Sequence, residues 1–344
     1  MGNTWTVLTS AATASDIQAA LTSASPRGGV QLAAGTWQLG SAAVGLSMDG
    51  GVALVGAGRE ATKLVYTGVG AALQINNGGR MTTSVSVRDL QLEGMGIGNI
   101  GIRCGQTLTS PLSANGQLEN LDVTNFVTAG IQCDVTQIMA IHRVYISGCG
   151  IGLYFAAPTS NGNLQIPVTN SRFEANGIGV KIESCVAVSF RDSIFQLNTA
   201  EGFLISYPSN APTCRMVTLD GCYFEQNNGL GQLAINAQGS AIPQQIYVRN
   251  SHFSTKGAGT SYHIAIAKGH VHLQDNDMID VAPWVSISNS TSNQVEVQDR
   301  YIPDTTSWVV GTVANVLWHV RVGSSMTHDI YNNVRGIPTL VWSI

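Results

Sequence analysis

Residues 168–182 read "VTNSRFEANGIGVKI" and contain the pattern that decides the fold. The first six residues comprise an apolar residue, two polar residues, a small residue, a variable residue and a second apolar residue. After a Gly/Asn turn, a second short run begins at Val180, again with apolar residues at alternate positions. Alternation with a period of two indicates short β-strands.

This hexapeptide recurs along the chain. It is found in eight windows: "VRDLQL" from Val87, "LENLDV" from Leu118, "IHRVYI" from Ile141, "VTNSRF" from Val168, "FRDSIF" from Phe190, "LDGCYF" from Leu219, "VRNSHF" from Val248 and "LQDNDM" from Leu273. A short alternating run follows each window: "IRC" from Ile102, "IQC" from Ile131, "LYF" from Leu153, "VKI" from Val180, "FLI" from Phe203, "LAI" from Leu233, "IAI" from Ile264 and "VSI" from Val285. Successive windows start 22 to 31 residues apart, without a helical period between them, so we predict stacked coils of two or three strands, a parallel β-helix.

Two positions of the hexapeptide predict the corners and the core. In seven of the eight windows the third position holds a residue that tolerates the left-handed backbone of a sharp corner: Asp89, Asn120, Asn170, Asp192, Gly221, Asn250 and Asp275. The last position is always apolar and predicts an inward column: Leu92, Val123, Ile146, Phe173, Phe195, Phe224, Phe253 and Met278. A continuous stacked core is therefore expected.

The N-terminal region supplies a cover for the open end of such a stack, where unpaired strand edges would invite aggregation. "SDIQAALTSA" predicts a capping helix with Ser15 as N-cap, Gln18 three residues later, and one apolar face made of Ile17, Ala20, Leu21 and Ala24. The boundaries we predict are residues 1–50 for the helix and first coils, 51–300 for the β-helix, and 301–344 for a Trp-containing C-terminal cap or oligomerisation segment.

The segments that follow the helix, "RGGVQLAAGTWQL" from Arg27 and "GVALVGAGREATKLVY" from Gly51, resemble the first coils of the pectin-lyase-like superfamily. The resemblance extends from residue 13 to about residue 290. It implies an all-β fold, a right-handed single-stranded parallel β-helix. The superfamily includes lyases, hydrolases, epimerases and viral tailspikes that act on polysaccharide, so the resemblance leaves the chemistry open.

Composition excludes several partners. Only 11% of the 344 residues are charged and the net charge is -4, which gives no basic surface for nucleic acid or for an anionic membrane. No apolar stretch is long enough to span a membrane. The six cysteines lack metal-site spacing and read as buried thiols, and His263, His270 and His272 read as ordinary polar surface rather than a metal site. The sequence therefore predicts no metal and no cofactor.

Two glutamates are candidate catalytic residues. Glu174 and Glu225 directly follow inward phenylalanines, with one coil between them. Two coil spacings amount to about 9.6 Å, close to the roughly 6.5–9.5 Å between the acid and the base of inverting glycosidases. The simpler interpretation is that Phe-Glu-x-Asn, found at both sites, is only a turn of the coil with a solvated glutamate.

The residue two positions before each glutamate also faces outward by strand alternation. This column reads Gln91, Asp122, Tyr145, Arg172, Ile194, Tyr223, His252 and Asp277. Tyr145, Arg172, Tyr223 and His252 are candidates for stacking on sugar rings and for hydrogen bonding. Long connections after Cys104, Phe155, Ile205 and Ile235 predict a wall on one corner, where a groove lined by Tyr207, Asn161, Gln165 and Asn210 would suit a glycan.

These features favour a phage tailspike-like receptor-binding protein that recognises, and in one interpretation depolymerises, a bacterial surface polysaccharide. The first residues lack the pattern of a secretory signal peptide, which favours a virion tail over a secreted enzyme. The resemblance also implies a homotrimer, with other tail proteins as further partners. A bacterial polysaccharide lyase or glycoside hydrolase, and a β-helix without catalysis, stay open as alternatives.

Overall fold

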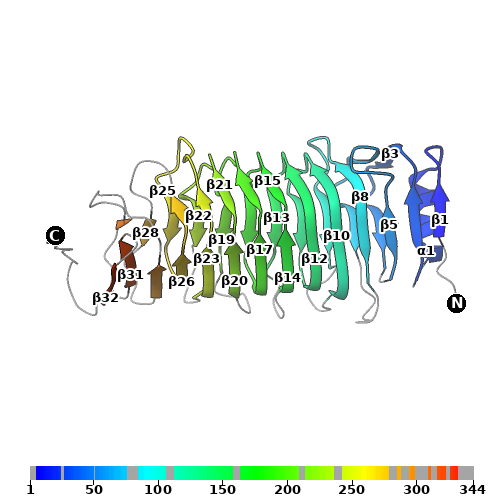
Figure 1. Cartoon of the computed structure of the whole chain (residues 1–344). Helices are drawn as coiled ribbons and strands as arrows, with labels where there is room; N and C mark the ends of the chain where they lie inside the picture. The colour runs from blue at the N-terminus through cyan, green and yellow to red at the C-terminus, as the bar shows by residue number, and fades with distance from the viewer. Residues whose placement is uncertain are drawn as a thin grey trace.

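The structure is a computed structural model that describes residues 5–24, 27–49, 51–75, 84–105, 112–157, 163–208, 214–235, 242–278, 285–287, 294–298, 309–310, 316–322 and 326–331. Figure 1 shows strands stacked side by side along one long axis, with the first described strand, residues 5–8, near one end and the last, residues 326–331, near the other. Almost every element is a strand, and each strand pairs with the strand one coil away. The predicted parallel β-helix is confirmed.

Each coil contributes to two sheets, which we name sheet A and sheet B. In the described residues, every strand pairing is parallel except the terminal pair β31–β32, and sheet B is the simpler of the two. Sheet B contains β4 (Val44–Met48), β7 (Ala71–Ile75), β9 (Ile100–Cys104), β11 (Ala129–Cys133), β13 (Ile151–Phe155), β16 (Ile178–Ile182), β19 (Phe203–Ile205), β22 (Gly231–Ile235), β25 (Tyr262–Ile266), β28 (Val285–Ile287) and β30 (Val309–Val310).

Sheet A forms two walls, because most coils place two of its strands on either side of a corner, and β8, β10 and β12 continue around that corner. Its strands are β1 (Trp5–Leu8), β2 (Gly29–Leu32), β3 (Gly35–Gly40), β5 (Ala53–Val55), β6 (Thr62–Tyr66), β8 (Ser86–Glu93), β10 (Leu112–Thr124), β12 (Thr136–Ser147), β14 (Asn163–Thr169), β15 (Arg172–Glu174), β17 (Cys185–Arg191), β18 (Ile194–Gln196), β20 (Cys214–Asp220), β21 (Tyr223–Glu225), β23 (Gln244–Arg249), β24 (His252–Phe253), β26 (His270–Gln274), β27 (Asp277–Met278), β29 (Gln294–Gln298), β31 (Val316–Val322) and β32 (Met326–Tyr331).

The inward column is the centre of one continuous core. Seven of its members, from Leu92 to Phe253, are buried, and Met278 packs against them with part of its surface exposed. The phenylalanines stack coil on coil: the ring centroids of Phe195 and Phe224 are 4.7 Å apart, and those of Phe224 and Phe253 are 4.5 Å apart. The core therefore follows from the last position of the hexapeptide, as predicted.

The corner between the two walls of sheet A has a left-handed residue in every window. All seven predicted residues have positive φ, from 49° at Asp192 to 65° at Gly221. In the remaining window, which begins at Ile141, the third residue is Arg143. It also adopts φ 53°, a conformation that an arginine side chain does not favour. The stack therefore imposes the corner even where the local residue type argues against it.

A second corner is built around buried asparagines. Asn176, Asn198 and Asn227 occupy the same place in consecutive coils, and each links two coils. The backbone N–H of Asn176 donates to Asn198 Oδ1 (3.0 Å), and the backbone N–H of Asn198 donates to Asn227 Oδ1 (3.2 Å). The Asn176 and Asn227 side chains donate to backbone carbonyls of the coils before them, those of Ile146 (3.0 Å) and Phe195 (2.9 Å). The Asn of Phe-Glu-x-Asn thus has a structural function.

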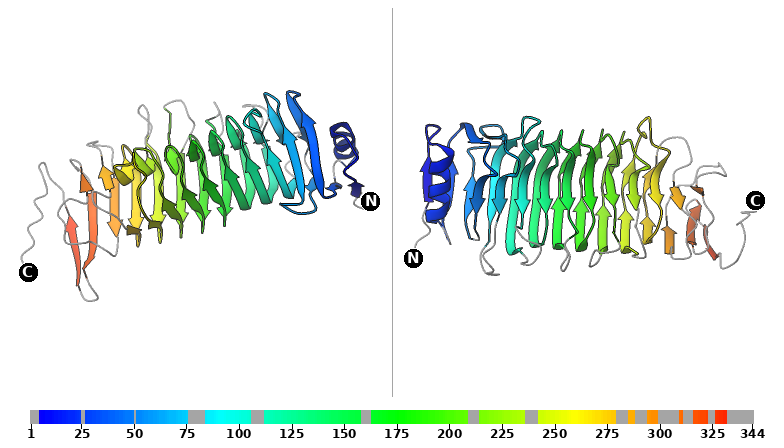
Figure 2. Two further views of the ribbon diagram at one scale, coloured as in Figure 1. Left: turned by 90° about the horizontal axis from the view of Figure 1, so that it is seen from above. Right: turned by 180° about the vertical axis from the view of Figure 1, so that it is seen from behind.

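The capping helix is α1 (Ala14–Ala24), which lies across the N-terminal end of the stack (Figure 2). Its predicted face, Ile17 with Ala20, Leu21 and Ala24, is buried. The predicted N-cap was wrong: Thr13 caps the helix, since its Oγ1 accepts from the backbone N–H of Asp16 (3.3 Å), and Asp16 Oδ2 accepts from the backbone N–H of Thr13 (2.7 Å). Gln18 instead exchanges two hydrogen bonds with the backbone of Ser47 in β4, at 3.0 and 2.7 Å.

Three remaining sequence predictions concern other parts of the chain. All six cysteines are buried free thiols. Within the described ranges, no helix has the length and apolarity needed to cross a membrane. Most of the C-terminal segment 301–344 lies outside the described residues; the described part adds β30 and the antiparallel pair β31–β32.

Candidate functional site

The predicted outward column exists and is in register from coil to coil; we call it the outer column. Each of its residues pairs with the next one along the stack. It consists of Gln91, Asp122, Tyr145, Arg172, Ile194, Tyr223, His252 and Asp277. Neighbouring members are therefore about one strand spacing, 4.8 Å, apart.

Glu174 and Glu225 lie beside the outer column, two residues further along their strands. Gln196 pairs with both, so one coil separates the two carboxylates, as predicted. Gln196 Nε2 donates to Glu174 Oε1 (3.1 Å), and Arg172 Nε lies 2.9 Å from Glu174 Oε2. Both oxygens of Glu174 are thus engaged, whereas the Glu225 side chain has no hydrogen bond or ion pair with other residues of the described part. The two carboxylates are therefore in different environments.

The aromatic members of the outer column stack on their neighbours. The rings of Tyr223 and His252 are 5.2 Å apart and nearly parallel, and His252 Nδ1 lies 3.0 Å from Asp277 Oδ2. The Arg172 guanidinium lies 5.9 Å from the centre of the Tyr145 ring. The rings of Tyr223 and His252 face one another along the axis, so these faces do not stack on a sugar. The phenol and imidazole groups are the parts that can contact one through hydrogen bonds.

The predicted groove wall is not assembled by the described residues. Tyr207 is 8% exposed and packs in the core cluster, so it does not join the outer column. Gln165 is exposed on β14, and Asn161 and Asn210 lie outside the described residues. Tyr207 was proposed from its place beside a long connection, a pattern that does not distinguish a buried tyrosine from an exposed one.

Two carboxylates lie on the outer-column wall of sheet A, in the coils before Tyr145: Asp122, a member of the outer column, and Glu93. Burial raises the pKa of Asp122, and the Arg59 guanidinium, whose Nε lies 3.2 Å from Asp122 Oδ1, only partly offsets this. Burial acts to raise the pKa of Glu93, but hydrogen bonds from Asn125, Thr124 and the Met95 backbone, together with the Lys63 charge, outweigh it and hold that pKa below its usual value. Both carboxylates are thus paired with protein groups.

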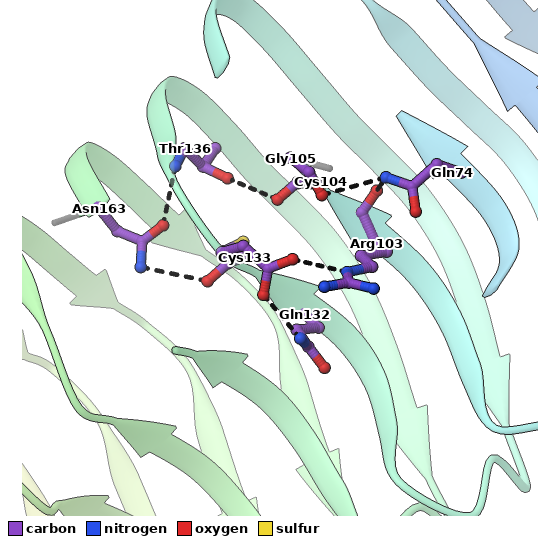
Figure 3. Close-up of polar contacts among 9 residues, drawn as sticks. Gln74, Arg103, Cys104, Gly105, Gln132, Cys133, Thr136 and Asn163 are labelled. Atoms are coloured by element: carbon purple, nitrogen blue, oxygen red, sulfur yellow. Dashed lines mark hydrogen bonds and ion pairs between the residues drawn. The ribbon is translucent and has the colours of Figure 1, made fainter. Parts of the chain in front are cut away.

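A second polar group, on sheet B, was missed. Arg103, Gln132, Tyr154 and Lys181 face outward at paired positions on β9, β11, β13 and β16. Figure 3 shows Arg103 and Gln132 together with the polar contacts around them. The sequence contained a pattern that could have identified these four residues. Each is the middle residue of a short run, "IRC", "IQC", "LYF" or "VKI", whose first and third residues point into the core.

Metal-ligand groups are not found among the described residues: they contain no cluster of three or more His, Cys, Asp and Glu side chains that could hold an ion. The three histidines that are close in sequence divide between the sheets. His263 is on β25 of sheet B and is buried, contrary to the predicted polar surface, whereas His270 and His272 are on β26 of sheet A.

Solved structures with a similar fold come from phages and from polysaccharide-modifying enzymes. The A-module of mannuronan C-5 epimerase AlgE4 of Azotobacter vinelandii gives a TM-score of 0.68 at 17% identity, covering 89% of this chain and 87% of the module. The ORF18 protein of Geobacillus virus E2 gives 0.61 at 16% identity, with 89% of this chain covered. Tailspike protein 4 of bacteriophage CBA120 gives 0.59 at 10% identity, with 90% of this chain covered.

The chain spans 57% of the Geobacillus virus protein and 42% of the CBA120 tailspike chain. No family model matches the sequence, and no curated protein matches it. Identities this low establish a shared fold, and the resemblance to the pectin-lyase-like β-helix proteins is confirmed at that level.

Proposed function

We propose that this chain binds a bacterial surface polysaccharide along the outer column, as the receptor-binding part of a phage tailspike. The observation that carries the proposal is the continuous outward register from Tyr145 to His252, in which Ile194 is the one aliphatic residue among Tyr145, Arg172, Tyr223 and His252. A glycan lying along the axis would meet a new side chain about every 4.8 Å. Phenol, guanidinium and imidazole groups suit hydroxyl and carboxyl groups on sugars.

Binding is tested with a panel of capsular and O-antigen polysaccharides. We expect Tyr223→Phe, which keeps the ring and removes the phenol oxygen, to weaken glycan binding roughly three- to tenfold, the value of one hydrogen bond. Tyr247→Phe is the matched control, because Tyr247 stacks on His272 at 4.8 Å in the same way, but on the other wall of sheet A. Equal losses in the two variants, or no binding by the wild type, would contradict the proposal.

The same panel distinguishes the chemical alternatives. New reducing ends without unsaturated products indicate a hydrolase, for which the matched positions of Glu174 and Glu225 are the supporting observation. Unsaturated products indicate a lyase, in which Arg172, Tyr223 or His252 would take the proton beside a uronate carboxyl. Binding without either product indicates a receptor-binding protein that lacks catalysis. We place cleavage by the glutamate pair second to binding.

The tailspike proposal includes a homotrimer in the virion tail. Support comes from a charge-poor sequence with 11% charged residues, which leaves ample neutral surface for subunit contacts. Light scattering on the intact chain is expected to give about three times the 36.2 kDa of one chain. A mass of one chain at every concentration would remove the trimer from the proposal.

A further inference from the structure

The outward side of sheet B carries two ion pairs separated by a tyrosine. Arg103 Nε lies 2.6 Å from Asp134 Oδ2, and Gln132 Nε2 donates to Asp134 Oδ1 (2.6 Å). Lys181 lies three coils beyond Arg103 and two beyond Gln132. Its Nζ lies 2.6 Å from Glu183 Oε1. We call the outward residues Arg103, Gln132, Tyr154 and Lys181 the sheet B column.

Tyr154 connects the second ion pair to the rest of the column. Its hydroxyl donates to Glu183 Oε2 (2.6 Å), and the Lys181 ammonium lies 5.4 Å from the centre of its ring. Burial and the hydrogen bond to Glu183 raise the pKa of Tyr154 well above its usual value, so the phenol keeps its proton. The site therefore presents a neutral ring between two cations.

Arg103 is clearly more accessible than the anion that holds it, whereas the Lys181 side chain is 23% exposed and that of Glu183 18%. The Arg103 side chain is 37% exposed, whereas that of Asp134 is 5% exposed with both oxygens engaged. The Asp134 carboxylate thus lies beneath the guanidinium and fixes its orientation. Arg103 uses Nε for this pair, which leaves its remaining N–H groups to donate to a ligand.

The strand ends beneath this site are fixed by buried amide and hydroxyl groups (Figure 3). Gln74 Nε2 donates to the carbonyl oxygens of Arg103 (3.3 Å) and Gly105 (3.1 Å). Thr136 Oγ1 donates to the Cys104 carbonyl (3.3 Å), and Asn163 Nδ2 donates to the Cys133 carbonyl (3.2 Å). These bonds hold the backbone from Arg103 to Gly105 and at Cys133, next to Asp134, and the ion pair with Asp134 then orients the guanidinium.

We propose that the sheet B column is a second glycan-binding site, specific for sugars that carry a carboxylate. This inference rests on the proposed function in that the ligand is a polysaccharide, but it uses a different sheet. Arg103 and Lys181 are three strand spacings apart, about 14 Å, a distance that brings separate units of one glycan chain within reach of both cations. A guanidinium binds a carboxylate through paired N–H donors, and this contact gives the site its preference for charged sugars.

The test measures binding of defined-length uronate oligosaccharides: oligogalacturonate, oligomannuronate and hyaluronan fragments. Their methyl esters and a maltooligosaccharide of equal length serve as uncharged probes. We expect at least one uronate to bind, with esterification or Lys181→Met weakening that binding about tenfold or more, the value of a hydrogen bond to a charged group. The double variant Arg103→Met/Asp134→Asn should have the same effect without leaving a buried carboxylate unpaired.

Arg191→Met is the matched control, because Arg191 is an exposed cation on β17 of sheet A. It should leave uronate binding unchanged. If no uronate binds better than its ester, or if Lys181→Met and the double variant bind as the wild type does, the sheet B site is wrong. A uronate that depends on Tyr223 and not on the sheet B column would overturn this inference while leaving the outer column intact.

Discussion

Replacing Phe195 with alanine is expected to lower the free energy of unfolding by about 3–5 kcal/mol, the usual cost of removing a buried aromatic ring. Phe195 is buried between two coils: its ring stacks on Phe173 at 5.3 Å and on Phe224 at 4.7 Å. It also meets the edge of Phe203 at 5.6 Å, from sheet B. The cavity would therefore open in the centre of the core, between rings from both neighbouring coils.

Chemical denaturation followed by far-UV circular dichroism measures this loss. Leu197→Ala is the control, because Leu197 lies two residues further in the same coil and is 44% exposed. Its cost should stay within about 0.5 kcal/mol. A Phe195→Ala variant as stable as the control would mean that the phenylalanine column does not support the stack.

The repeat explains why the core could be predicted so fully from the sequence. Strand alternation decides which residue of a hexapeptide points inward, and stacking places equivalent residues of successive coils in contact. The corner was predictable for a related reason, since Asn, Asp and Gly tolerate left-handed backbone. Arg143 was not predicted there, because the conformation comes from the coils on either side of it and not from its own preference.

Local choices between similar residues were less predictable. Thr13 and Ser15 are both capping types, and the choice depends on Asp16, which is three residues after Thr13 and completes the box. The burial of Tyr207 was not predictable, because exposure next to a connection depends on packing that the sequence pattern does not specify. The ion pairs of the sheet B column join residues two positions or a whole coil apart, so they become visible only in the structure.

The structure gives separate roles to the positions of the Phe-Glu-x-Asn motif, which occurs at residues 173–176 and 224–227. Phe173 and Phe224 belong to the core, and Asn176 and Asn227 belong to the corner ladder, so these positions are explained by the fold. The glutamates are not: Gln196 occupies the equivalent position in the coil between them, and the corner forms there equally well. The fold therefore does not require glutamate at these positions, and two interpretations stand: solvated neighbours of the corner, or a pair that cleaves a glycan.

If the chain cleaves a glycan, Glu174→Gln and Glu225→Gln should each lower turnover by about 10²–10⁴-fold, the contribution of a positioned general acid or base. Arg172 and Gln196 engage both oxygens of Glu174, which suits the base, and Glu225 is then the proton donor.

Aryl glycosides with good leaving groups test this division of roles, because their cleavage needs no acid. Glu225→Gln should regain activity on them and Glu174→Gln should not. Glu119→Gln, on the other wall, is the control. Full activity in both variants would mean that the two glutamates are not catalytic and are only solvated residues next to a corner, since neither side chain is needed to hold the stack.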